Sequence, residues 1–183
     1  ALLGVTVIIV VANLLLSLHG AGAFPKDTGL RFVVMATLFY LVVSIQGSMQ
    51  AFMSVNAFVH FTDWVIGHSH LAMLGFATFA AAGGLAHVWP HIPGARFNPR
   101  AMSWAYWLLF GGLMLMVVDL TLAGLVEAQL WQMGAPWTSS LDAARPYWIV
   151  RTLSAIPIAS GFIAFLVGLT TGPRSPLRAE VAP

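Results

Sequence analysis

The stretch HFTDWVIGHSHLAMLGF, residues 60–76, places His68 and His70 at the start of a long apolar run. An ionisable side chain inside a hydrocarbon layer is costly and usually has a partner or a function. Successive residues of an α-helix are about 100° apart, so positions i and i+2 point to nearly opposite sides. The stretch therefore predicts a membrane helix that carries one histidine on each of two opposed faces.

The composition of the whole chain is that of a membrane protein. Of the 183 residues, 59% are hydrophobic and only 8% are charged, whereas a soluble domain has about 25% charged residues. The net charge of +2 rests on few ionised groups, and the sequence has no basic stripe, so nucleic acid is not an expected partner. The absence of cysteine excludes disulfides and thiolate metal ligands. The lipid bilayer is the expected environment.

Five apolar stretches are long enough to cross a bilayer, which needs about 20 residues in a helix. They cover approximately residues 2–18, 30–54, 64–89, 102–130 and 147–171, and polar or Pro/Gly-containing connectors join them. We therefore expect an all-α, polytopic membrane helical bundle with five transmembrane helices over residues 1–172, followed by a cytoplasmic tail over residues 173–183. The opening ALLGVTVIIVVANLLL is interpreted as a span rather than a signal peptide.

The cationic residues predict an orientation, because cytoplasmic loops carry an excess of Lys and Arg. Only Arg145 and Arg151 fall on one side of the five-span topology. The other side carries Lys26, Arg31, Arg96, Arg100, Arg174 and Arg178. We therefore expect a periplasmic N-terminus and a cytoplasmic C-terminus, which puts His68 and His70 near the outer end of the third span.

The spacing of the two histidines bears on what they could bind. Two histidines that share one metal on a helix would use i, i+4 spacing. An i, i+2 pair can instead ligate two different centres that flank the helix, and imidazole is a standard axial ligand of haem iron. The alternative is that each imidazole hydrogen-bonds a neighbouring helix or extends to the membrane interface.

Polar and aromatic residues precede the pair. His60, Thr62, Asp63 and Trp64 could hydrogen-bond haem propionates or bound water. The equally weighted alternative to a cofactor role is that Asp63 caps the helix and that Trp64 belongs to the aromatic belt at the membrane surface. Small residues fill the inner half of the span, from Gly75 to Gly84, and predict close approach of neighbouring helices.

The segment VNAFVHFTDWVIGHSH, residues 55–70, resembles the haem-ligand helix of the catalytic subunit of haem–copper oxidases, specifically the cbb3-type cytochrome c oxidase branch. LRFVVMATLFYLVVSIQGSMQAFMSVN resembles the preceding span of that family, and DLTLAGLVEAQLW and YWIVRTLSAIPIASGFI resemble its last two. The resemblance covers nearly the whole chain and corresponds to the last five of the family's spans. Nitric oxide reductases share the superfamily and a similar histidine pair, and are the second interpretation.

The resemblance implies roles for the pair. His68 would be the proximal ligand of a high-spin haem, and His70 one of two axial ligands of a low-spin haem. Both haems would be of b type, and copper, or non-haem iron in the reductases, would be bound by residues outside this chain. The chain would act in the bacterial inner membrane with the N-terminal spans of the catalytic subunit and with membrane-anchored c-type cytochrome subunits. The complex would reduce dioxygen to water with electrons from cytochrome c and translocate protons.

One position departs from the family pattern. Gln46, in IQGS, stands where the cbb3 pattern has a glutamate near the proximal side of the high-spin haem. A glutamine keeps hydrogen bonds but lacks the charge, so the departure puts in doubt a proton or cation role there. A hydrogen bond between helices is the equally weighted alternative for Gln46.

Charged residues in the last two spans need partners inside the membrane. We expect Asp119 to pair with Arg151, because antiparallel neighbours bring their outer ends together. Glu127 is expected at the interface.

Two further classes of function remain open at the level of sequence. One is a non-catalytic b-type cytochrome that uses His68 and His70 with ligands from partner chains. The other is a transporter or structural membrane subunit, in which the two histidines would hold no haem.

Overall fold

The computed structural model describes residues 2–18 and 27–175, and these residues are helical apart from turns and one isolated bridge. Lys26, Arg178 and residues 176–183 of the predicted tail lie outside the described residues. The helices are α1 (Leu2–Leu16), α2 (Thr28–Gln50), α3 (Met53–Val59), α4 (Asp63–His70), a π-helical segment (Leu71–Ala77), α5 (Thr78–Val88), a 3-10 turn (Trp89–His91), α6 (Pro99–Gln132) and α7 (Trp137–Thr170). The prediction of an all-α architecture is confirmed for this part of the chain.

Four helical stretches are long and apolar enough to cross a membrane: Thr28–Gln50, Asp63–His91, Pro99–Gln132 and Trp137–Thr170. The predicted first span is shorter than expected. Helix α1 has 15 residues, or about 22 Å at 1.5 Å per residue, which is less than the roughly 30 Å of a hydrocarbon core. The described residues thus form four full-length candidate spans and one shorter apolar helix, in a multi-pass membrane protein.

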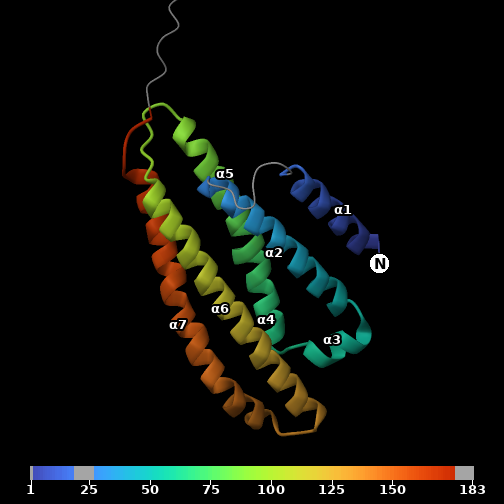
Figure 1. The fold of residues 1–183 in the computed structure, drawn as a ribbon. Coiled ribbons are helices and arrows are strands. Elements are labelled where there is room, and N and C mark those ends of the chain that lie inside the picture. Colours follow the sequence, from blue (N-terminus) through green and yellow to red (C-terminus); the bar gives the residue numbers. More distant parts are fainter. Residues whose placement is uncertain (1, 19–26, 176–183) are drawn as a thin grey trace, which may run out of the picture.

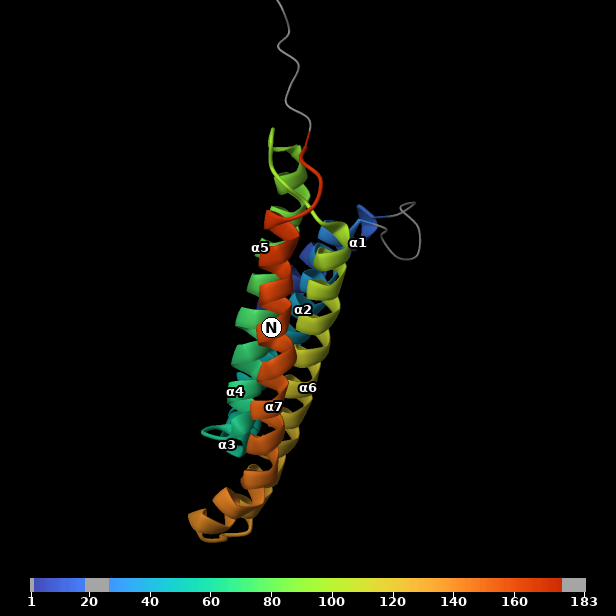
Figure 2. The ribbon, with the colours of Figure 1, turned by 90° about the vertical axis from the view of Figure 1, so that its left-hand side faces the viewer.

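Helices α6 and α7 run side by side along their length, and the α4–α5 stretch and α2 pack beside them (Figures 1 and 2). Helix α1 lies against α2 at the edge of the bundle (Figure 1). Glycines permit the close approach of α6 and α7. A Cβ on Gly112 would lie 2.7 Å from Ile158 Cγ1, and one on Gly161 would lie 2.7 Å from Leu109 Cγ.

The core of the bundle contains a cluster of aromatic rings from three spans. Phe32 of α2 lies with its ring centroid 5.2 Å from those of Phe79 in α5 and Tyr106 in α6, both in edge-to-face geometry. A Cβ on Gly83 would lie 2.7 Å from Val33 Cγ2, so the predicted close approach of helices occurs at this glycine, whereas a Cβ on Gly84 would meet nothing within 4 Å.

Two of the predicted connectors are partly helical. Helix α2 ends at Gln50, earlier than the predicted span 30–54, and α3 occupies most of the predicted loop over residues 55–63. Helix α7 begins at Trp137 and contains Pro146, which the prediction placed in a connector. Proline is tolerated inside membrane helices because local adjustments satisfy the freed backbone groups, so it did not mark the start of the helix.

The third span is continuous but not uniform. Its N-cap is Thr62, whose hydroxyl oxygen accepts from the backbone N–H of Trp64 at 3.3 Å, so the interpretation of Asp63 as the cap is wrong by one residue. Directly after His70 the helix widens into a π-helical segment, and Thr78 Oγ1 donates to the carbonyl of Met73, five residues back, at 2.9 Å. Segments of this kind occur frequently at functional sites.

Candidate functional site: two histidines on one helix

His68 is half-buried and faces α2. Its Nδ1 lies 3.2 Å from Gln46 Oε1, and the adjoining Gly47 lies beside the ring, where an added Cβ would make an ordinary contact of 3.6 Å with His68 Cε1. The ring is parallel to that of Trp64 within 4°, at a centroid distance of 5.8 Å. Gln46 of α2 and Trp64 of α4 therefore orient this imidazole.

His70 is bonded within its own helix. Its Nδ1 lies 2.8 Å from the carbonyl oxygen of Ile66, one turn back. The side chain is partly exposed, between Ile66, which is 39% exposed, and Met73, which is 68% exposed. Met73 therefore lies on the same open face of the bundle as His70.

The two hydrogen bonds define the tautomers. The amide oxygen of Gln46 and the carbonyl oxygen of Ile66 can only accept, so the Nδ1 atom of each histidine carries the proton. In a neutral imidazole the Nε2 atom then holds the lone pair. Neither Nε2 has a hydrogen-bond partner among residues 2–18 and 27–175. Histidines that bind metal characteristically donate their other N–H in this way, so both side chains fit axial ligation of haem iron.

Asp63 belongs to a different set of contacts. It is buried at 6% exposure, its Oδ2 accepts from the indole N–H of Trp148 at 2.7 Å, and its backbone N–H donates to Glu127 Oε2 at 2.7 Å. The start of the third span is thus tied to both α6 and α7. Glu127 is itself buried inside the protein, at 7% exposure.

The sequence-predicted site residues therefore separate into groups. Gln46 and Trp64 contact His68, whereas Asp63 faces the last two helices. His60 is exposed, and its ring lies against Phe61, with centroids 3.9 Å apart. The structure does not bring His60 to either histidine of the pair.

The expected ion pair between Asp119 and Arg151 does not form. The ion pairs within 4.0 Å among the described residues join His87 to Asp27 and Arg145 to Asp142. Asp119 is buried at 6% exposure, and its Oδ2 has no hydrogen-bond partner in the described part of the chain. Asp119 and Arg151 do lie on neighbouring helices, α6 and α7, but the sequence could not give the distance between their side chains.

Trp148 and Glu127 are the contacts that sequence reasoning missed. They lie 85 and 64 residues from Asp63 in the chain, so no local pattern joins them to it. Within the described residues, 2–18 and 27–175, no group of three or more His, Cys, Asp or Glu side chains could hold a metal ion.

Comparison with known proteins places this geometry in a family. The family model described as "Cytochrome C and Quinol oxidase polypeptide I" matches residues 1–157. The chain belongs to this family. Its members are haem–copper oxidases, and the helix with the histidine pair lies inside the matched region.

The chain is similar to several relatives within the oxidase family. It is 27% identical over 168 residues to "Cytochrome c oxidase subunit 1 homolog" of Agrobacterium tumefaciens (strain T37), which covers 86% of this chain and 31% of the relative. It is 28% identical over 155 residues to "Cbb3-type cytochrome c oxidase subunit CcoN1" of Stutzerimonas stutzeri, covering 78% and 33%. A nitric oxide reductase chain of the same organism is 21% identical over 148 residues, covering 75% and 31%. The chain spans about a third of the length of these curated relatives.

Proposed function

We propose that this chain forms the C-terminal portion of the catalytic subunit of a cbb3-type terminal oxidase and supplies one axial ligand to each of two haems. His68 is the proximal ligand of the high-spin haem, and His70 is a ligand of the low-spin haem. The observation that carries the proposal is the pair of Nε2 lone pairs on two sides of one helix, each set by a hydrogen bond at Nδ1. Membership of the oxidase family and the similarity to a cbb3-type subunit support it.

In this proposal two haems, of b type, would be held by His68 and His70 and would supply redox-active iron for the reduction of dioxygen to water with electrons from cytochrome c. The chain's own residues hold the two imidazoles. Gln46 keeps the Nδ1 proton of His68, Trp64 stacks on its ring, and the Ile66 carbonyl keeps the Nδ1 proton of His70. A helix between two redox centres fixes their separation, because both ligands move with one rigid element.

The remaining parts lie outside this chain. Copper and the second ligand of the low-spin haem belong to the N-terminal spans of the subunit, and membrane-anchored c-type cytochrome subunits deliver the electrons. The complex lies in the bacterial inner membrane, with the N-terminus of this chain periplasmic and its C-terminus cytoplasmic. The excess of positive charge at one end of the spans supports this orientation.

A nitric oxide reductase is the second candidate. The similarity to a nitric oxide reductase chain favours it, and Gln46 in place of the cbb3 glutamate weakens the assignment to the main oxidase branch. In that case non-haem iron would replace copper, and the roles of His68 and His70 would be unchanged.

The first test is a carbon monoxide difference spectrum of the dithionite-reduced native complex. We expect a carbon monoxide-sensitive haem in the wild type that is lost in His68→Ala, because that substitution removes the proximal ligand of the open haem. His70→Ala should instead remove the low-spin haem absorption. His60→Ala is the matched control, since His60 is exposed and remote from both ligands, and its spectra should equal those of the wild type.

The outcomes separate the candidates. A wild-type complex without any haem that reacts with carbon monoxide would exclude both catalytic interpretations and leave at most an electron-transfer cytochrome. If the reactive haem is present, metal analysis for one copper or one additional iron per complex distinguishes the oxidase from the reductase.

A further inference from the structure

The end of the bundle opposite the histidine pair is closed by two short segments that run alongside each other. Residues 94–98 lead into α6, and residues 171–175 follow α7. The backbone N–H of Ser175 donates to the Ala95 carbonyl at 2.8 Å, and that of Phe97 donates to the Pro173 carbonyl at 3.2 Å. Ser175 Oγ also donates to the Pro90 carbonyl at 2.5 Å. This part of the surface is therefore built on a defined backbone frame.

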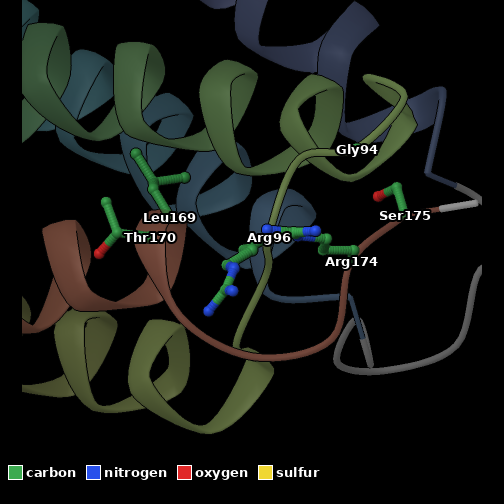
Figure 3. Close-up of a pocket in the computed structure, with 6 residues that line it drawn as sticks. All are labelled: Gly94, Arg96, Leu169, Thr170, Arg174 and Ser175. Atoms are coloured by element: carbon green, nitrogen blue, oxygen red, sulfur yellow. The ribbon is translucent and has the colours of Figure 1, made fainter. Parts of the chain in front are cut away.

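Two arginines stand opposite each other on this frame. Arg96 and Arg174 form the isolated antiparallel bridge, so their side chains leave the backbone as a cross-strand pair (Figure 3). Like charges directly opposite each other are destabilising. Among residues 2–18 and 27–175, neither guanidinium has a carboxylate within 4.0 Å. The pair lines a hollow of about 410 Å³ together with Gly94, Leu169 and Thr170.

The end of helix α7 does not explain the two charges. Cations near a helix C-terminus can stabilise its unpaired carbonyls. Here the Leu169 carbonyl accepts from the indole N–H of Trp89 at 2.9 Å, and the Gly168 carbonyl accepts from the backbone N–H of Asn98 at 2.8 Å. These two carbonyls already have donors, and no guanidinium hydrogen bond joins Arg96 or Arg174 to another of the described residues, so both groups can meet an external anion.

We propose that Arg96 and Arg174 bind the phosphate of an anionic phospholipid at this end of the bundle. A guanidinium presents a planar fork of N–H donors that matches a phosphate, and two of them together suit one anion better than a single point charge. The hollow is lined by Leu169 and Thr170, the last residues of the candidate span Trp137–Thr170, and a basic pocket at the end of a span is where anionic headgroups bind. Bound phosphate removes the repulsion within the pair.

The test uses the delipidated native complex in detergent and measures lipid binding by native mass spectrometry. The probe is dioctanoyl phosphatidylglycerol, with dioctanoyl phosphatidylcholine and inorganic phosphate in parallel titrations. We expect R96Q and R174Q each to lower the affinity for phosphatidylglycerol by about tenfold, the effect of losing one charge-assisted hydrogen-bonded contact. R100Q, which removes an exposed arginine in the first turn of α6 outside the hollow, should leave the affinity unchanged.

Each outcome bears on the proposal. Equal affinity in wild type, R96Q and R174Q would overturn it. Competition by millimolar inorganic phosphate would support the phosphate site but assign it to the free ion. Binding of phosphatidylglycerol that phosphate does not displace would assign it to the lipid. The intact mass of each variant complex shows that the substitution has not prevented assembly.

Discussion

The hydrogen bond between His68 and Gln46 joins a ligand of the third span to the neighbouring helix α2. Because an amide is neutral, it orients the imidazole without drawing much charge from it. A carboxylate at the same place would pull more strongly on the Nδ1 proton and make Nε2 a more electron-rich donor, since such outer contacts tune a bound metal. The residue at position 46 therefore tunes how strongly His68 Nε2 donates electrons to a bound metal, and glutamine gives a weaker donor than glutamate would.

Gln46→Glu should therefore lower the midpoint potential of the haem that reacts with carbon monoxide, and Gln46→Leu should raise it or broaden its titration. The measurement is a spectroscopic redox titration of the purified complex. Gln50→Leu is the matched control, because it changes the same residue type in the same helix without touching His68. Unchanged potentials in both Gln46 variants would show that the hydrogen bond does not act on the haem.

Glu127 accepts from the buried backbone N–H of Asp63 at 2.7 Å. Glu127→Leu should lower the stability of the complex, because an unsatisfied buried donor costs about 1–3 kcal/mol. Glu127→Gln keeps an acceptor oxygen and should cost much less. Thermal denaturation of the purified variants measures the difference, with Gln129→Leu, an exposed position in the same helix, as the control. Equal losses in Glu127→Leu and Glu127→Gln would indicate that the charge, rather than the acceptor, matters.

At the scale of helices, the third span approaches α6 through glycine. A Cβ on Gly124 would overlap the backbone nitrogen of Trp64 and lie 2.6 Å from its Cα, so this crossing admits no side chain. Because Trp64 stacks on His68, the crossing also sets where that imidazole stands.

Gly124→Ala should push α4 away from α6, destabilise the complex by about 1–3 kcal/mol or more, and reduce the content of haem that reacts with carbon monoxide. Gly111→Ala is the control, since a Cβ on Gly111 of the same helix would meet nothing within 4 Å. The measurements are the melting temperature and the haem content per protein. A fully loaded Gly124→Ala complex with wild-type stability would contradict the role given to this crossing.

The helices also show what a single sequence can predict. Hydropathy predicts the spans well because the hydrocarbon layer imposes a length and a composition on them. It did not predict α3, whose seven residues include polar ones, or the start of α7, where Pro146 is accommodated inside the helix. The opposed histidines follow from helical geometry alone. The contacts of Asp63 with Glu127 and Trp148 required the folded chain, because they join residues far apart in sequence.

At the scale of the whole molecule, the distribution of charge predicts which ends face which compartment. The chain has no cysteine of its own, so introduced cysteines report their own positions. Met133, 66% exposed after α6, and Ile92, 42% exposed before it, are matched apolar positions at opposite ends of the bundle.

We expect Met133→Cys to react with a membrane-impermeant maleimide in intact spheroplasts, and Ile92→Cys to react only after the membrane is permeabilised. Separation of the subunits on a denaturing gel assigns the label to this chain. The reverse pattern would invert the proposed orientation and place the histidine pair near the cytoplasmic surface.

The two long helices α6 and α7 also determine how far the protein extends from the membrane. Each has 34 residues, or about 51 Å of helix, which exceeds a hydrocarbon core by roughly 20 Å. If the two helices stand perpendicular to the membrane, this extra length of paired helix extends beyond the hydrocarbon layer into the aqueous phase. Any protein that approaches the membrane from that side would meet the ends of these two helices before it meets the lipid, so their length limits how closely it can come to the membrane surface.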